Sequence, residues 1–241
     1  MATKAVFFDF GGTLFVIRHH EVLRTLLHEE GRDVGPDSVR DAYFSVEPWW
    51  LAVYGTQELG PDATEEAYRV LDMRVIMKLF PDEPPSEVEG LSRLVRAKAP
   101  ELERSIPPEL YPDALPVLKK LKDEGLRVGL VSNATAKTRR TIEATGLADI
   151  LDPIIISAEV KCLKPNPKIF RIALEAARAR PEEAIHVGDI FESDVAGARN
   201  AGMEGILIDR DGRSHRPDCP TVSSLHQVIV YATRTGRSRS G

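Results

Sequence analysis

The stretch that decides the fold is residues 5–13, which read Ala-Val-Phe-Phe-Asp-Phe-Gly-Gly-Thr. Its first four residues are apolar, and they are followed at once by a carboxylate, Asp9, and then by two glycines within a few positions. A short apolar run that ends at a glycine turn is typical of a strand buried on both faces. Ligands of open parallel sheets bind beyond the carboxyl ends of the strands, so we expect Asp9 to lie at an active site.

Similar apolar runs recur later in the chain, with stretches of helical periodicity between them. We expect strands at 5–8, 127–131, 154–157, 185–187 and 206–208, and helices at 113–124, 135–145, 167–179 and 193–201. Strands that alternate with helices pair in parallel, so the predicted fold class is α/β with a parallel sheet.

The interval between the first two strands, residues 9–126, is far longer than a crossover helix requires and must hold its own structure. Four amphipathic helices are expected there, at 20–30, 37–46, 62–79 and 86–98, with separators such as Glu47-Pro48-Trp49-Trp50 and return linkers near Pro100 and Pro107-Pro108. The predicted domains are a core at 1–15 and 109–232, an inserted all-helical domain at 16–108 and a disordered tail at 233–241.

Composition places the chain among ordinary globular proteins: it has 241 residues, of which 42% are hydrophobic, and a formal net charge of −5. A nucleic-acid-binding protein needs a clustered positive face, so no nucleic-acid partner is expected. The two cysteines, Cys162 and Cys219, are too few for a disulfide framework, which favours a reducing, cytoplasmic location. The sequence has no basic and apolar leader and no run of roughly 18 apolar residues, so neither secretion nor membrane insertion is expected.

Polar residues follow four of the predicted strands. These residues are Asp9 and Thr13 after the first, Ser132-Asn133 after the second, Lys164-Pro165-Asn166-Pro167 after the third, and Gly188-Asp189 with Asp194 after the fourth. Each group alone has a common structural explanation, since Ser-Asn often caps a helix and Lys-Pro or Gly-Asp often forms a turn. Their order and their shared position at strand ends favour one common site.

In this order the four groups resemble the motifs of the haloacid dehalogenase (HAD) superfamily. Motif one is Phe7-Phe8-Asp9-Phe10-Gly11-Gly12-Thr13, motif two is Val131-Ser132-Asn133, motif three is Lys164-Pro165-Asn166-Pro167, and motif four runs from His186-Val187-Gly188-Asp189 through Asp194. The resemblance covers the whole core. It implies a Rossmann-like sheet with a type C1 helical cap inserted after motif one.

The resemblance also implies the chemistry of a Mg²⁺-dependent phosphatase that acts on a small phosphorylated metabolite. Asp9 would attack phosphorus to form an aspartyl-phosphate, and Lys164 would place a positive charge beside it. The implied ligands are Thr13, Ser132 and Asn133 for the substrate, and Asp9, the Gly11 carbonyl, Asp189 and Asp194 for Mg²⁺, with Asp194 acting directly or through a water.

Gly11 departs from the family pattern, in which phosphatases carry a second aspartate here as general acid and base. Glycine keeps the main-chain carbonyl that the family gives to the metal, but it has no side chain to move a proton. Because general acid/base groups typically contribute about 10² to 10⁴ in rate, a weakened phosphatase is expected. His19, His20, Glu21 and Glu192 are candidate replacements, although the simpler interpretation places them at the starts of helices, facing water.

Other activities of the superfamily fit parts of the sequence. Haloacid dehalogenases also lack the second aspartate, but they lack the paired acids of motif four, which Asp189 and Asp194 provide here. Phosphonoacetaldehyde hydrolases carry a small residue at the Gly11 position and use a cap lysine, for which Lys78 and Lys98 are the candidates. A non-catalytic phosphate-binding relative is a further alternative, and both a monomer and a homodimer are compatible with the sequence.

Aromatic residues are expected in two other places. In the helical domain, Tyr43, Trp49, Trp50 and Tyr54 either line the cover over the strand ends or form the core of that domain. His186, within the fourth strand, is expected to pack in the core of the sheet.

Overall fold

The computed structural model describes residues 2–35, 37–54, 61–106, 108–212 and 218–234. They form two compact units. The core unit comes from the described parts of Met1–Val16 and Pro108–Gly241, and the cap unit from those of Ile17–Tyr54 and Pro61–Pro107. Within these described ranges, no helix has both the length and the apolar character that a membrane span requires.

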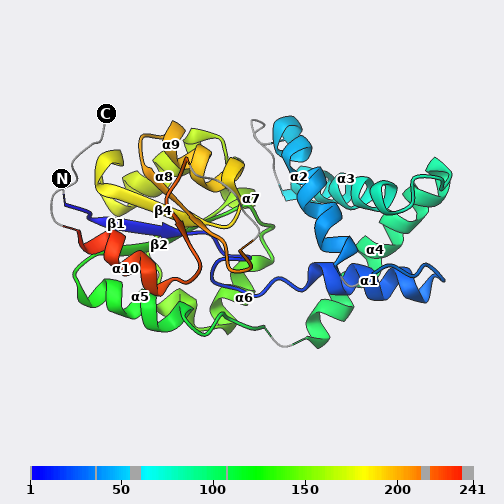
Figure 1. Ribbon diagram of the computed structural model, residues 1–241, viewed down its shortest axis with the longest axis horizontal. Helices are drawn as coiled ribbons and strands as arrows, with labels where there is room; N and C mark the ends of the chain where they lie inside the picture. Colours follow the sequence, from blue (N-terminus) through cyan, green and yellow to red (C-terminus); the bar gives the residue numbers. More distant parts are fainter. Residues whose placement is uncertain (1, 36, 55–60, 107, 213–217, 235–241) are drawn as a thin grey trace. The chain divides into compact units, whose positions relative to one another are not determined.

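The core unit is built on one six-stranded parallel sheet (Figure 1). Its strands are β1 (Ala5–Phe8), β2 (Arg127–Ser132), β3 (Ile154–Ile156), β4 (Ala184–Gly188), β5 (Glu204–Ile208) and β6 (Thr221–Val222). Their order across the sheet is β3-β2-β1-β4-β5-β6, and all neighbours are parallel. The predicted α/β fold with a Rossmann-like parallel sheet is therefore confirmed, and β1 lies between β2 and β4.

Helices cover both faces of this sheet. The helices of the core unit are α5 (Ala114–Asp123), α6 (Thr138–Ala144), α7 (Ser157–Val160), α8 (Pro167–Ala177), α9 (Gly197–Asn200) and α10 (His226–Thr233), with short turns η1 (Leu147–Asp149), η2 (Pro181–Glu183) and η3 (Phe191–Ala196). Val6 and Phe8 of β1 pack in an apolar cluster with α5 and α10, whereas Ala5 and Phe7 pack in a second cluster with α8 and α9. Figure 1 shows these two pairs of helices on opposite sides of β1. Because successive side chains of a strand point to opposite faces, a strand covered on both sides must be apolar throughout.

The cap unit is made of four helices: α1 (His19–Glu29), α2 (Ser38–Tyr54), α3 (Pro61–Leu79) and α4 (Pro85–Ser105). The fully buried carboxylate of Asp72, in α3, joins all four. It accepts a hydrogen bond from the Tyr43 hydroxyl, lies 3.2 Å from His19 Nε2 and pairs with Arg96 Nε at 2.6 Å. Burial alone would raise the pKa of Asp72, but these partners together lower it, so the carboxylate stays ionised.

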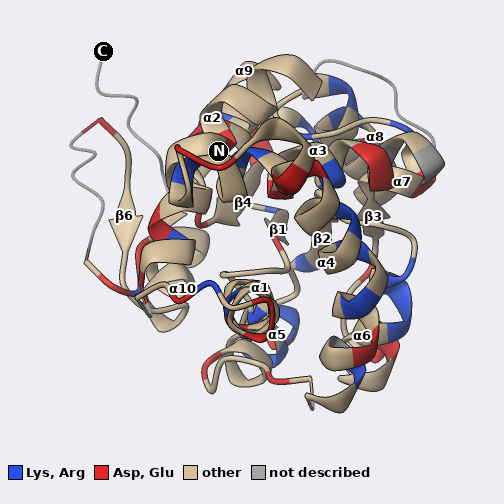
Figure 2. Ribbon diagram, turned by 90° about the vertical axis from the view of Figure 1, so that its right-hand side faces the viewer, with Lys and Arg blue, Asp and Glu red and all other residues tan. Residues whose placement is uncertain are grey.

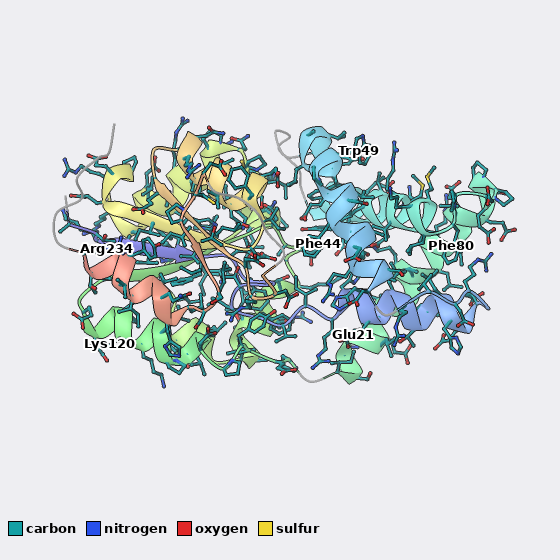
Figure 3. The ribbon with its side chains drawn as sticks, viewed as in Figure 1. Glu21, Phe44, Trp49, Phe80, Lys120 and Arg234 are labelled. Atoms are coloured by element: carbon teal, nitrogen blue, oxygen red, sulfur yellow. The ribbon has the colours of Figure 1, made fainter. Side chains whose placement is uncertain are left out.

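The two tryptophans of α2 have different surroundings. Trp50 is 2% exposed, and its Nε1 donates to Ala67 O at 2.6 Å, so it belongs to the core of the cap unit. Trp49 is 36% exposed, and the guanidinium of Arg74 lies 4.0 Å above its ring. Phe44, on the same helix, is also exposed, and Figure 3 shows Phe44 and Trp49 along α2.

Two prolines expected to separate elements lie inside helices instead. Pro48 is within α2, which runs on to Tyr54 rather than ending near residue 46, and Pro100 is within α4, which runs on to Ser105. A proline removes one N–H from the helix and usually ends it. In α2 the helix continues because the buried Trp50, beyond the proline, is bonded to α3.

The core unit also differs from expectation at its ends. The strand predicted to reach residue 157 stops at Ile156, because Ser157 starts α7. The predicted helix at 193–201 is a π-helical turn, η3, followed by α9, and β6 and α10 had no prediction. The predicted tail began at Thr233, which is the last residue of α10, and residues 235–241 lie outside the described residues.

Acidic and basic residues are interspersed along the helices (Figure 2). Several form pairs one helical turn apart, such as Glu66–Arg69 at 2.6 Å and Lys120–Glu124 at 2.6 Å. Exposed pairs of this kind contribute little to stability, so the fold rests mainly on the buried apolar clusters.

Gly205 allows β5 to contact η3, and this contact yields a test of the packing. A Cβ at Gly205 would lie 2.7 Å from both the Cα and the O atom of Val195, which are backbone atoms and cannot swing aside. We expect Gly205→Ala to lower the free energy of unfolding by about 1–3 kcal/mol through overpacking, as measured by urea denaturation. Gly90→Ala is the comparison, because nothing lies within 4 Å of its Cβ position and alanine favours the interior of α4. An unchanged urea midpoint for Gly205→Ala would contradict this packing.

Candidate active site

The carboxyl ends of β2, β1 and β4 are adjacent, because these strands are neighbours in the sheet. Asp9 follows β1 directly, and its main-chain N–H donates to Val187 O of β4 at 2.8 Å. Ser132 is the last residue of β2, and Asp189 follows β4. Three of the four motifs are therefore at one edge of the sheet.

Lys164 of motif three also lies at this edge of the sheet, in contact with Asp9. Its Nζ donates to Asp9 Oδ1 and to Asp194 Oδ1, at 2.6 Å in each case. The Lys164 side chain is 2% exposed, and both carboxylates are buried. Because an unpaired buried charge is costly, this ammonium holds the carboxylates of motifs one and four together.

The three groups shift one another's pKa values. Burial alone would lower the pKa of Lys164, but Asp194 and Asp9 outweigh it and raise that pKa, so the ammonium stays charged. Burial raises the pKa of Asp9, and the attraction of Lys164 only partly offsets it. The pKa of Asp194 is lowered, because Lys164 and His186 outweigh the effect of burial.

Asp194 is the better satisfied of the two carboxylates. In addition to Lys164 on Oδ1, it accepts hydrogen bonds on Oδ2 from Ile190 N at 3.0 Å and Ser193 Oγ at 3.2 Å. His186 Nε2 lies 2.9 Å from Oδ1, and burial lowers the pKa of His186, so the neutral ring donates its Nε2 proton to the carboxylate. These contacts make Asp194 an anchor for Lys164. The predicted contact of Asp194 with Mg²⁺, direct or through a water, stays a prediction.

Asn133 holds the main chain of Lys164. Its Nδ2 donates to Lys164 O at 2.9 Å, and its Oδ1 accepts from Lys164 N at 2.7 Å. This pair of bonds joins the loop after β2 to motif three. The predicted contact of Asn133 with substrate stays a prediction, but its position beside Lys164 already has a structural reason.

The turn after β1 is closed by main-chain hydrogen bonds and carries the side chain of Thr13. Leu14 N and Phe15 N both donate to Phe10 O, at 2.9 and 2.8 Å, which closes the turn around Gly12 in a left-handed conformation with φ of 74°. Thr13 is fully buried, and among the described residues its Oγ1 finds no hydrogen-bond partner. Buried hydroxyls usually have a hydrogen-bond partner, and a bound ligand is one group that could supply the partner here.

The carboxylate of Asp189 lies against the same turn. A Cβ at Gly12 would lie 2.2 Å from Asp189 Oδ2, so glycine here allows that carboxylate to reach the turn. No hydrogen bond to Gly11 O or Asp9 Oδ2 occurs within the described part of the chain. Two carboxylates and one carbonyl fit Mg²⁺, a hard cation that takes few protein ligands and keeps several waters. The described residues hold no group of three or more His, Cys, Asp or Glu side chains arranged for a metal, and the predicted Mg²⁺ ligands stay a prediction.

The candidate replacements for the missing acid lie in varied surroundings. His19 is bound to the buried Asp72 of the cap unit, and Glu21 pairs with Arg18 at 3.1 Å. Burial lowers the pKa of the neighbouring His20. A role for His19, His20, Glu21 or Glu192 in place of the missing acid stays a prediction.

The sequence did not indicate how closely the motifs pack on their glycines. A Cβ at Gly188 would lie 2.1 Å from Asp194 Cγ, just as one at Gly12 would meet Asp189. The hydrogen bond of His186 to Asp194 was also missed, although its burial was expected. A glycine close to an acidic residue in motif one or motif four was the feature of the sequence that could have indicated these close contacts.

Asp194→Asn tests the anchoring of Lys164. This change removes one of the two charges that stabilise the buried ammonium, and we expect a loss of about 3–5 kcal/mol in the free energy of unfolding at pH 7. Because the folded-state pKa of Asp194 is below its ordinary value of 3.8, its stabilising effect is present above that pH and is lost as the pH falls further. The difference between wild type and variant should therefore shrink in acid, as measured by urea unfolding at several pH values.

Asp152→Asn is the matched control, because Asp152 is exposed and its pair with Arg127 spans 3.7 Å. This control should leave the urea midpoint unchanged at every pH. An equally small effect of Asp194→Asn would contradict the anchoring role.

Comparison with known proteins places the chain in a family. The family model of the haloacid dehalogenase-like hydrolases matches residues 3–202. A phosphoserine phosphatase of Thermus thermophilus is 39% identical over 125 residues, which cover 50% of this chain and 50% of that protein. The chain thus spans about half the length of the curated relatives it matches.

Solved structures with the same fold include enzymes named for two chemistries. A HAD phosphatase of Thermococcus onnurineus covers 97% of this chain and all of its own, with a TM-score of 0.59 and 24% identity. The L-2-haloacid dehalogenase RSc1362 covers 97% of this chain and all of its own, with a TM-score of 0.67 and 18% identity. The motifs, the parallel sheet and the family match confirm the predicted family: the chain belongs to the haloacid dehalogenase-like hydrolases.

Proposed function

We propose that this protein is a Mg²⁺-dependent phosphatase that hydrolyses small phosphorylated metabolites through an aspartyl-phosphate on Asp9. The observation that carries the proposal is the buried pair of Asp9 and Lys164 at the carboxyl end of β1, 2.6 Å apart. A carboxylate fixed through one oxygen by a permanent cation keeps its other oxygen for nucleophilic attack.

The reaction would proceed in two displacements. Asp9 Oδ2 attacks phosphorus and the bond from phosphorus to the leaving oxygen breaks, which yields an acyl phosphate and an alcohol after protonation by solvent. Water then attacks the phosphorus of the acyl phosphate, gives up a proton to solvent and releases inorganic phosphate and the Asp9 carboxylate. Throughout, Lys164 stays charged and offsets negative charge beside Asp9.

Phosphate oxygens would find further donors in the hydroxyls of Thr13 and Ser132, both buried. Thr13 Oγ1 has no hydrogen-bond partner in the described ranges of the chain, which supports this role. Mg²⁺, held by Asp9, the Gly11 carbonyl and Asp189, would supply charge neutralisation between the nucleophile and the phosphate. Asp194 would act through Lys164 rather than as a direct ligand, since both of its oxygens accept hydrogen bonds from the protein.

Several observations favour a phosphatase over the other activities of the family. Asp189 at the turn gives the site a second carboxylate for a metal, and the Thermus relative is named a phosphoserine phosphatase. A Schiff-base lysine needs a desolvated amine, but Lys78 is exposed and Lys98 is half-exposed, with Glu29 and Glu30 each 3.5 Å away. The phosphonoacetaldehyde hydrolase reaction is therefore not favoured.

Wild type should release phosphate from p-nitrophenyl phosphate in Mg²⁺, and chelation of the metal should stop this release. Asp9→Asn should abolish it because the amide is not a nucleophile, whereas Asp152→Asn, at an exposed position, should keep wild-type rates. Chloride release from 2-chloropropionate is measured in parallel. Asp9-dependent chloride release without phosphate release would overturn the proposal in favour of a dehalogenase, and phosphate binding without turnover would favour a non-catalytic protein.

The missing acid leads to a second prediction, about leaving groups. Gly11 lacks the positive φ of Gly12, so an aspartate can adopt its backbone conformation. Gly11→Asp should raise hydrolysis of an alkyl phosphate such as glycerol phosphate by about 10² to 10⁴, the usual contribution of a general acid and base. Acetyl phosphate, whose leaving group needs no proton, should gain much less. Equal gains for both substrates, or none for the alkyl phosphate, would show that Gly11 is not the cause of weak activity.

A further inference from the structure

Arg210, two residues beyond β5, connects three segments of the core unit that are far apart in the sequence. Its Nη2 donates to Thr13 O at 2.7 Å. Its two terminal nitrogens also form a fork on Asp113, with Nη1 to Oδ2 at 3.1 Å and Nη2 to Oδ1 at 3.0 Å. The guanidinium lies 3.7 Å from the centre of the Tyr111 ring, which covers one of its faces.

Asp113 is itself fixed, so the guanidinium has a rigid support. Its Oδ2 accepts additional hydrogen bonds from Ser224 Oγ and from Leu225 N, both at 2.9 Å. Burial alone would raise the pKa of Asp113, but Arg210 and these donors lower it, so the carboxylate is ionised opposite the arginine. A planar fork bonded to a carboxylate and stacked on a ring is a geometry that lysine cannot reproduce.

The contact with Thr13 acts on the turn that carries the site. The carbonyls around it are bonded within the core unit: Phe10 O accepts from Leu14 N, and Leu14 O accepts from Tyr111 N at 3.0 Å. The carbonyl of the fully buried Thr13 accepts instead from the Arg210 side chain. Because the same residue presents a buried hydroxyl that has no partner among the described residues, its backbone position decides where that hydroxyl points.

We propose that Arg210 is a positioning residue for phosphate binding: anchored by Asp113 and Tyr111, it fixes the Thr13 main chain so that the Thr13 hydroxyl faces the phosphate. This inference rests on the proposed function for its ligand. It assigns to the loop after β5 a part in the active site that none of the four motifs includes. Arg210 acts through Thr13 and does not itself contact the phosphate.

The test uses the 241-residue chain, with Mg²⁺ and inorganic phosphate as the probe. Arg210→Met alone leaves the Asp113 carboxylate without its arginine, which by itself lowers stability. The double variant Arg210→Met/Asp113→Asn removes both charges. Comparing the two variants therefore separates the effect of losing the ion pair from the effect of losing the hydrogen bond to Thr13 O. Arg127→Met is the matched control, an exposed arginine at the start of β2. Three quantities are measured: the dissociation constant for phosphate by calorimetry, the unfolding temperature, and hydrogen exchange at the main-chain amides of residues 12–15.

We expect both Arg210 variants to bind phosphate about tenfold more weakly than wild type, the scale of one hydrogen bond to a charged group. The double variant should regain unfolding temperature relative to Arg210→Met without regaining phosphate affinity, and the amides of Gly12, Leu14 and Phe15 should exchange faster in both. Arg127→Met should match wild type in all three measurements.

Wild-type phosphate affinity in the double variant would overturn the positioning role, since the charge pair would then account for the whole effect. Hydrogen exchange separates this inference from the proposed function. If wild type binds no phosphate, the proposed function fails, while faster exchange of the turn in the Arg210 variants still supports the positioning of Thr13 and unchanged exchange overturns it.

Discussion

The ammonium of Lys164 lies out of contact with water between two carboxylates, 2.6 Å from Asp9 and 2.6 Å from Asp194. A buried cation of this kind cannot be left unpaired, so every element that carries one of these groups must meet at the same point. The site therefore depends on the order of β2, β1 and β4 in the sheet, which brings their carboxyl ends together. Asn133 adds to this constraint by holding the Lys164 main chain from the loop after β2.

The two carboxylates share one cation but differ in their own partners. Asp194 accepts hydrogen bonds from Ile190 N and Ser193 Oγ in addition to Lys164, and its pKa is lowered. Among the described residues, Lys164 gives the Asp9 side chain its one hydrogen bond, and burial raises the pKa of Asp9. The well-satisfied carboxylate suits a structural anchor, and the nucleophilic role proposed for Asp9 rests on the difference between the two.

The close packing of the carboxylates depends on glycines, which have no Cβ. Gly12 and Gly188 admit the carboxylates of Asp189 and Asp194 to positions that a Cβ would occupy, and Gly205 lets η3 approach β5. The sequence showed these glycines, but their neighbours lie on other elements or around a turn, so the close approaches could not be read from spacing alone. Gly11 is different, because its consequence is a missing side chain, and that was visible in the motif itself.

The sequence by itself determined the α/β class, the first strand at residues 5–8 and the family, because strand alternation and motif order are local patterns along the chain. It did not determine that α2 and α4 continue through Pro48 and Pro100, because contacts such as that of Trp50 with α3 override a local helix-breaking signal. Nor could it reveal the contacts of Arg210 with Thr13 and Asp113, because Arg210 lies outside the four motifs. Only the tertiary structure decided how many hydrogen-bond donors surround each carboxylate and in which direction its pKa moves, since Asp9 and Lys164 are 155 residues apart in the sequence and these properties are set by burial and by the donors around them.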